Sequence, residues 1–134
     1  YHPGGSLGKE LNLKVKEIIF KNEKPEVKEN ANLKTIINEI SKKMLGATAI
    51  VKHNKAIGII TDGDLRRMLE KNTNLSELKA SDIMSENPKI IHSNCLAAEA
   101  LSVMEKNNIS QLIVMDRETY CGIVHVHDII KEGI

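Results

Sequence analysis

The sequence predicts a mixed α/β (α+β) fold in which two similar repeats of the order β-α-β-β-α follow one another. The first observation is an internal match: residues 58–65 (GIITDGDL) resemble residues 122–129 (GIVHVHDI), at an offset in numbering of 122 − 58 = 64. The second is that both strings are preceded by apolar residues at helical spacing and then by short apolar runs typical of strands. Together these observations predict a pseudo-two-fold pair of repeats.

The alignment of the repeats also predicts where one extra residue lies. Upstream of the matching strings, Pro25 aligns with Pro88, and the offset in numbering there is smaller by one (88 − 25 = 63). Between the later strands, residues 116–119 replace the shorter stretch 53–55. A turn accepts an inserted residue at little cost, so the second hairpin turn is expected to be the longer one.

The first repeat is predicted to contain five elements. They are a strand at 26–28, a helix over 33–44, strands at 48–52 and 56–61, and a helix at 62–70. The first helix is indicated by apolar residues at helical spacing: Leu33, Ile36, Ile37, Ile40 and Met44. Asn30 or Asn32 is expected to cap its start and Gly46 to end it.

The second repeat is predicted to contain the same elements. They are a strand at 89–92, a helix over 96–104, strands at 111–115 and 120–125, and a helix at 127–131. Ser93 or Asn94 is expected to cap the first of these helices. Residues 71–79 are interpreted as a polar loop, and residues 81–84 as a short helix capped by Ser81.

The composition excludes several classes of protein. Only 2% of the residues are aromatic and the net charge is +1, whereas nucleic-acid binding needs stacking rings or a concentrated positive surface. No apolar run approaches the roughly 18 residues of a membrane span. Cys95 and Cys121 lack metal-ligand spacing and are interpreted as reduced thiols of a cytoplasmic protein. No secretion signal is recognised at its start, and because the chain begins at Tyr1 rather than Met it is expected to be a fragment.

The paired repeats resemble a known family. Asp82-Ile83-Met84 stands before the second repeat, and the pattern Gly58-x-x-Thr61-x-x-Asp64 closes the first strand pair; both are similar to CBS domains. The resemblance covers about residues 14–132. It implies one repeat at residues 14–72, a linker at 73–79 and a second repeat at 80–134.

The start of the chain (YHPGGSLGK) carries a second resemblance. It is similar to the junction between the sugar-isomerase (SIS) domain and the CBS pair of arabinose-5-phosphate isomerases. These enzymes interconvert ribulose 5-phosphate and arabinose 5-phosphate for the synthesis of Kdo, a sugar acid of lipopolysaccharide and capsule. The resemblance implies that residues 1–13 are a remnant of the junction, that an SIS domain precedes Tyr1, and that His2 matches an isomerase-site histidine.

The chain alone is not predicted to be an enzyme, and no catalytic residue is assigned within it. It has no Ser-His-Asp set in a recognisable context, no P-loop, no GxGxxG and no HExxH. The CBS resemblance instead implies ligand binding between the repeats, with Thr61 at a phosphate and Asp64 at ribose hydroxyls. A carboxylate accepts hydrogen bonds from a vicinal diol, and Arg66 or Arg67 could reach a phosphate. The alternative is that Thr61 and Asp62 only cap the helix that begins near Gly63.

The second repeat keeps the acid as Asp128 but has His125 in place of the threonine and His127 in place of Gly63. A neutral imidazole could bind a base or sugar, and a protonated one could meet a phosphate. If the strand continues, the two histidines share a face that could suit a metal, but no third ligand is evident, so no metal is assigned. The alternative is an exposed or helix-capping pair.

Three functions follow as hypotheses. The first is a regulatory module that needs no cofactor and binds a nucleotide or nucleotide-sugar, with CMP-Kdo and adenine nucleotides as candidate ligands. The second is a non-sensing scaffold that associates into a dimer of pairs and holds a tetrameric parent together. The third is a free-standing protein or a part of a transporter or dehydrogenase, which the residues His2–Ser6 argue against.

Overall fold

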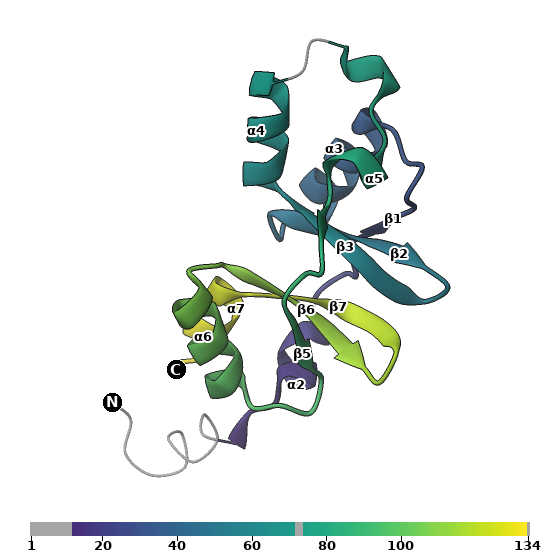
Figure 1. Cartoon of the computed structure of the whole chain (residues 1–134). Coiled ribbons are helices and arrows are strands. Elements are labelled where there is room, and N and C mark those ends of the chain that lie inside the picture. Colours follow the sequence, from purple (N-terminus) through teal and green to yellow (C-terminus); the bar gives the residue numbers. More distant parts are fainter. Residues whose placement is uncertain (1–11, 72–73, 134) are drawn as a thin grey trace.

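The computed structural model describes residues 12–71 and 74–133, and its first half contains one repeat preceded by a short helix (Figure 1). The elements are α2 (Val15–Ile19), β1 (Glu26–Val27), α3 (Leu33–Lys43), β2 (Ala47–Lys52), β3 (Lys55–Thr61) and α4 (Asp62–Lys71). The second half begins with a 3-10 turn at Leu75–Glu77 and another short helix. Its elements are α5 (Ala80–Ile83), β4 (Ser85–Glu86), β5 (Ile90–His92), α6 (Ala97–Asn107), β6 (Gln111–Asp116), β7 (Thr119–His125) and α7 (Val126–Ile130).

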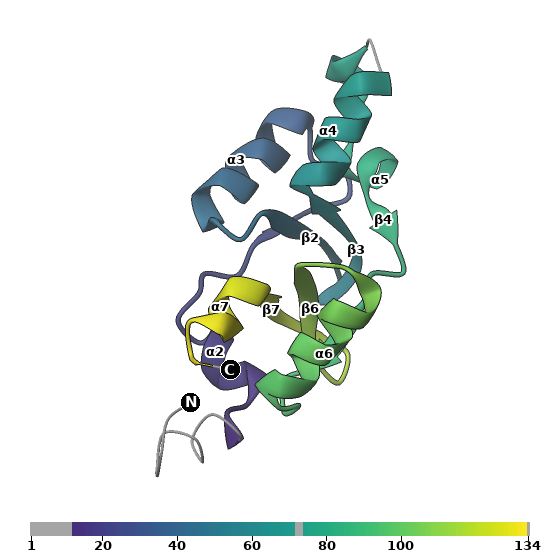
Figure 2. The ribbon, with the colours of Figure 1, turned by 90° about the vertical axis from the view of Figure 1, so that its left-hand side faces the viewer.

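The strands form two small sheets that confirm the predicted α/β fold of two tandem repeats. The first sheet has the order β1-β2-β3-β4 and the second β5-β6-β7. In each repeat the first strand is parallel to the second, and the second and third form an antiparallel hairpin. The sheets meet in the middle of the molecule and the helices lie outside them, with α3, α4 and α5 on one lobe and α2, α6 and α7 on the other (Figures 1 and 2).

The register of the repeats differs from the sequence alignment. Glu26 pairs with Ala49 and Ile90 with Ile113, so both strands keep the offset of the later strings (90 − 26 = 64 and 113 − 49 = 64). Both hairpin turns are equally long, since the pairs that close them are Lys52–Lys55 and Asp116–Thr119. The smaller offset and the longer second turn that the sequence predicted are therefore wrong. The two prolines are not equivalent. The second strand donates a backbone hydrogen bond to the Pro25 carbonyl in the first repeat and to the Lys89 carbonyl in the second, so Pro25 corresponds to Lys89.

The extra residue lies instead in the first repeat, between α2 and β1, when that stretch is compared with the one between α5 and β5 (26 − 15 = 11 against 90 − 80 = 10). The Val15 amide donates to the Cys95 carbonyl, and the Ala80 amide donates to the Ala31 carbonyl, so these residues are equivalent at an offset of 80 − 15 = 65. The same bonds reveal an exchange of helices between the repeats. The helix α2, which precedes the first repeat, packs on the second sheet, and α5 packs on the first.

The helix ends correct several predictions and confirm one. Asn32 caps α3, its side chain accepting from the Thr35 amide at 2.9 Å. The αL residue that ends α3 is Met44 (φ 60°) rather than Gly46, which follows with φ 71°. The N-cap of α6 is Leu96, not Ser93 or Asn94, because Ser93 is buried and its amide bonds to Met115. Ser81 lies inside α5 and does not cap it.

The two sheets pack face to face through side chains that alternate along the strands. Along β6, Leu112 and Val114 face the helices of their own lobe, while Ile113 and Met115 face the other sheet. The buried residues between the sheets are Leu45, Ala47, Ala49, Ile113, Met115, Tyr120 and Ile123. The apolar runs in the sequence thus correspond to strands that are covered on both faces.

Tyr120 fastens the repeats to each other. Its side chain is 1% exposed, its hydroxyl donates to the Pro25 carbonyl, and its amide donates to the Asn54 carbonyl at 2.7 Å. Burial, with the charges of Glu26 and Glu39, raises the pKa of this phenol above its ordinary value. Tyr120 is therefore a neutral hydrogen-bond donor throughout the physiological range.

Both cysteines are free and half-buried. None of the helices in residues 12–71 and 74–133 is long and apolar enough to cross a membrane.

Replacing Tyr120 by phenylalanine tests this fastening. Y120F leaves the packing in place but deprives the buried Pro25 carbonyl of its hydroxyl donor, which costs about 1–2 kcal/mol. Urea unfolding is expected to give a lower midpoint with an unchanged slope. The exposed substitution E118Q is the control and is expected to change the free energy of unfolding by less than about 0.5 kcal/mol. Equal midpoints for Y120F and the wild type would contradict the assigned role.

Candidate functional site

Thr61 and Asp64 form a reciprocal capping box where β3 passes into α4. The Thr61 hydroxyl accepts from the Asp64 amide at 3.1 Å, and the Asp64 carboxylate (Oδ2) accepts from the Thr61 amide at 2.9 Å. Thr61 thus caps the helix as the capping alternative expected, whereas Asp62 lies inside α4 as its first residue. The cap does not compete with a binding role, because the threonine hydroxyl and the carboxylate each keep unused acceptor positions.

The capping box opens into a cleft of about 750 Å³ between the two repeats. From the first repeat and the segment after it come residues at the end of β3, the start of α4 and the strand β4. From the second repeat come the loop between α6 and β6 and the end of β7. The lining residues are Gly46, Ile59, Thr61, Asp62, Gly63, Asp64, Arg66, Arg67, Ser85, Glu86, Asn87, Pro88, Lys89, Asn108, Ile109, Ser110, Gln111 and His125.

This cleft gathers five of the seven residues that the sequence indicated: Thr61, Asp64, Arg66, Arg67 and His125. His127 and Asp128 do not line it. The charges are mixed, since three acids and three permanent cations border the space. With the start of a ten-residue helix at its wall, the cleft can accept both an anion and a group rich in hydroxyls.

Arg67 is already engaged with the capping box. Its guanidinium (Nη2) lies 2.8 Å from the Asp64 carboxylate (Oδ1), with exposed side-chain fractions of 61% and 14%. The same guanidinium lies over Gly63, where a Cβ would stand 3.3 Å from Nη1 and 3.6 Å from the Thr61 hydroxyl. Glycine at this position therefore leaves room for an arginine, or for a ligand group, against the start of the helix.

His125 ends β7 and is the N-cap of α7. Its ring nitrogen Nδ1 accepts from the His127 amide at 3.0 Å, and the two rings meet edge to face with centroids 4.9 Å apart. A neutral ring that accepts at Nδ1 carries its proton on Nε2, so it presents a donor. The strand ends at His125, as predicted, and the helix begins at Val126, so the continued strand that a shared histidine face would need is not formed. The histidines are a capping pair, and no cluster able to hold a metal occurs in the described residues.

Asp128 is occupied by the protein itself. Its side chain is buried, and the carboxylate oxygen Oδ2 accepts from the Asn22 side chain and from the His125 amide, both at 3.1 Å. Lys131 approaches the other oxygen at 3.8 Å. The two repeats thus use the same acid differently, because Asp64 borders an open cleft and Asp128 holds the segment after α2.

The side chain of Gln111 and the loop before it were missed by the sequence reasoning. Gln111 bridges the repeats by donating to the Leu45 carbonyl at 3.1 Å, and it lines the cleft together with residues 108–110 and 85–89. These residues carry no motif. The pairing of Gln111 with His125 brings the loop 108–111 to the site, and the pairing of β4 with β3 brings residues 85–89 there.

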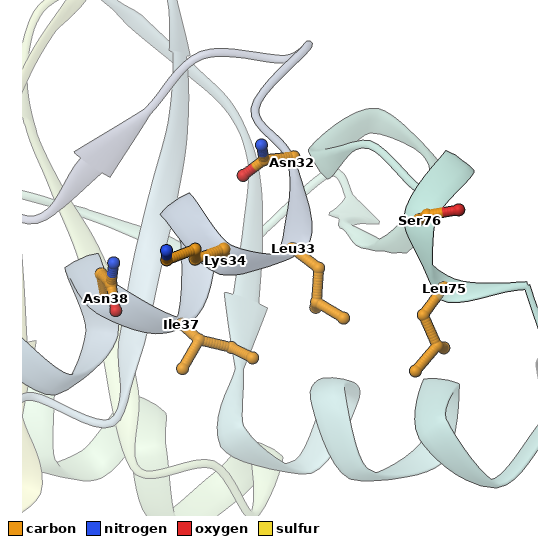
Figure 3. A pocket seen from close by; sticks show the side chains of 7 residues that line it. All are labelled: Asn32, Leu33, Lys34, Ile37, Asn38, Leu75 and Ser76. Atoms are coloured by element: carbon orange, nitrogen blue, oxygen red, sulfur yellow. The ribbon is translucent and has the colours of Figure 1, made fainter.

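A second hollow of about 490 Å³ lies between α3 and the 3-10 turn (Figure 3). Leu33 and Ile37 of α3 and Leu75 of the turn point toward the same gap. Its lining includes one charged residue, Lys34, and none of the predicted site residues. The inter-repeat cleft is therefore the better candidate for ligand chemistry.

Comparison with known proteins agrees with this architecture. The sequence profile described as "CBS domain" matches residues 15–71 and 80–134. Among solved structures, a CBS domain protein from Pyrobaculum aerophilum complexed with AMP superposes with a TM-score of 0.78 at 17% identity, covering 87% of this chain and 89% of that one. The CBS domain pair of protein MJ0100, in complex with 5′-methylthioadenosine and S-adenosyl-L-methionine, has a TM-score of 0.75 at 28% identity, covering 88% and 93%.

Curated proteins resemble the chain along nearly its whole length. Arabinose 5-phosphate isomerase KdsD of Francisella tularensis is 46% identical over 132 residues, which cover 97% of this chain and 40% of that protein. KdsD of Escherichia coli K12 is 36% identical over 135 residues, covering 99% and 41%. The chain thus spans about 40% of the length of the curated relatives that it matches.

The capping role of His125 gives stability a dependence on pH. Burial, followed by the charge of His127, lowers the pKa of His125 below its ordinary 6.5, although Asp128 opposes the shift. The unfolded chain therefore binds the proton first, and this contribution to stability is lost as the pH falls below about 6.5. In urea unfolding at a series of pH values, H125N is expected to lose less stability than the wild type between pH 7.5 and 5, because asparagine caps without titrating.

The matched control for this experiment is H53N. His53 is exposed in a hairpin turn at φ 52°, a conformation that asparagine adopts readily, so the wild-type pH dependence should persist. If H125N loses as much stability as the wild type between pH 7.5 and 5, the assignment of this pH dependence to His125 is contradicted.

Proposed function

The chain belongs to the CBS domain family, and from that premise we propose that it is a regulatory module that binds a nucleotide or nucleotide-sugar in the cleft between its repeats. The observation that carries this proposal is the cleft itself. It joins the capping box of Thr61 and Asp64 to Arg66, Arg67 and the opposite repeat's His125 in one space of about 750 Å³. Ligand pockets for small molecules have this size, and the polar and charged lining of this cleft suits a charged, hydroxyl-rich ligand.

The parent of this module is proposed to be an arabinose-5-phosphate isomerase. Support comes from the KdsD proteins, which are 35–46% identical over nearly all of the chain. In that parent, an SIS domain would interconvert ribulose 5-phosphate and arabinose 5-phosphate for Kdo synthesis. His2 would belong to its active site, and it lies outside the described residues. The enzyme would work as an oligomer. It would be located in the cytoplasm, where Cys95 and Cys121 would stay reduced.

Two ligands are candidates. Adenine nucleotides are suggested by the CBS pair of MJ0100, which is in complex with 5′-methylthioadenosine and S-adenosyl-L-methionine, and by the AMP complex from Pyrobaculum aerophilum. CMP-Kdo is suggested by the proposed pathway, since an activated end product could act by feedback. Adenine nucleotides and CMP-Kdo each offer a ribose diol that could bind Asp64 and a phosphate that could bind at the start of α4.

A ligand panel measured by thermal shift and calorimetry tests the proposal. AMP, ATP, CMP and CMP-Kdo are each added to the purified chain, and at 100 times Kd a ligand should stabilise it by about 2.7 kcal/mol. D64N is expected to weaken binding about tenfold, because a charge-assisted hydrogen bond to the diol is lost. D82N is the control, since Asp82 accepts from the Lys79 amide in a similar capping geometry but does not line the cleft.

A flat response across the panel would contradict sensing. It would leave the scaffold hypothesis, in which the pair holds the oligomer together without a ligand.

The binding stoichiometry provides a separate test. Asp128 is buried and bound to Asn22 and His125, so the second repeat does not offer its acid to a ligand as the first does. Titration calorimetry is therefore expected to give one nucleotide per chain. Two equivalent sites per chain would contradict this expectation and would require Asn22 to release Asp128.

A further inference from the structure

An ion pair lies at the position in the cleft that a ribose would use. In the capping box, the Asp64 oxygen Oδ2 accepts from the Thr61 amide, and Arg67 donates to the other oxygen, Oδ1, at 2.8 Å. Because the capping box engages Oδ2, Oδ1 is the more accessible oxygen for a vicinal diol. The guanidinium therefore stands in the way of that diol.

The same guanidinium also covers the start of α4. It lies close to the Cα of Gly63, as the 3.3 and 3.4 Å distances from an ideal Cβ position to its two terminal nitrogens indicate, and near the Thr61 hydroxyl. This is where an anion would approach the free amides of the helix. One side chain thus borders both parts of the expected ligand site.

We infer that Arg67 is a specificity residue that selects phosphorylated nucleotides over nucleosides, a role that rests on the proposed nucleotide binding. When a nucleotide enters, its diol replaces the guanidinium at Asp64, and the released guanidinium meets the phosphate of the same ligand. A nucleoside displaces Arg67 from Asp64 but offers it no anion in return. The site thus discriminates nucleotides from nucleosides because the Arg67 guanidinium can move from the Asp64 carboxylate to a ligand phosphate.

The energies of the two contacts favour this exchange. A half-exposed ion pair between neighbouring turns of a helix is weak, and 61% of the Arg67 side chain is exposed. A guanidinium can hold a phosphate through two parallel hydrogen bonds, which are stronger and more directional. The pair with Asp64 is therefore easily broken by a ligand that supplies a phosphate.

The second repeat contains an equivalent ion pair that does not border the cleft. Asp128 and Lys131 occupy the positions of Asp64 and Arg67 at one common offset in numbering (128 − 64 = 131 − 67), and their charged atoms are 3.8 Å apart. Asp128 is held by Asn22 and lies outside the cleft. K131M therefore removes a similar helix-surface pair and serves as a matched control.

The test compares AMP with adenosine, and CMP with cytidine, on the wild type, R67M, R66M and K131M by titration calorimetry. R67M is expected to bind the monophosphates about tenfold more weakly, and the nucleosides about two- to fivefold more tightly, because the competing ion pair is gone. R66M also removes a cation from the cleft, but this cation is not paired with Asp64, so nucleoside binding should not improve. K131M should match the wild type, and R67K should recover part of the preference for monophosphates.

The outcomes separate this inference from the proposed function. Equal losses for nucleotide and nucleoside in R67M, or no change in either, would overturn the role of Arg67 while leaving nucleotide binding in place. A gain in nucleoside affinity in R66M as well would assign the effect to the general charge of the cleft and overturn the inference. If the wild type and all variants bind neither ligand, the proposed function fails and the specificity role fails with it.

Discussion

The face-to-face packing of the two sheets is the constraint on which the rest of the structure depends. One face of each hairpin is covered by helices, and its opposite face is covered by the hairpin of the other repeat. Ala47 and Ala49 of β2 are small, and the larger Ile113 and Tyr120 of the opposite sheet fill the space between the layers. The cleft begins where this contact ends, because Thr61, Gln111 and His125 are all terminal residues of strands.

The capping boxes show how one local arrangement can serve two purposes. At Thr61 and Asp64 the groups that begin α4 also border the cleft, so their orientation is fixed before any ligand arrives. At His125 and Asp128 the same arrangement begins α7, but Asn22 occupies the acid. The acid at this position thus takes part in a cap in both repeats, and neighbouring segments decide whether it is also accessible from the cleft.

Local pattern was sufficient to predict the class of the fold and most of its elements. Short apolar runs, helical spacing and the internal repeat are all readable along the chain, and all three correspond to elements of the structure. The register upstream was wrong because two prolines suggested an equivalence that the backbone hydrogen bonds do not support. The exchange of α2 and α5 and the placement of Gln111 depend on contacts between distant segments, and no residue spacing encodes them.

The site could be predicted only where its residues lie together in the sequence. Thr61 to Arg67 form one continuous string, so its motif was readable, whereas the opposite wall comes from loops without a motif. The ion pair between Arg67 and Asp64 was not foreseen, because rotamer choice depends on the space left by Gly63.

The exchanged helices make folding a shared property of the whole chain. A repeat cut out at the linker would keep the short helix that serves its neighbour and lack the one that covers its own sheet. Its core, which Ala80 completes in the first repeat and Val15 in the second, would then be open to water. We therefore expect the two repeats to form and unfold as one cooperative unit.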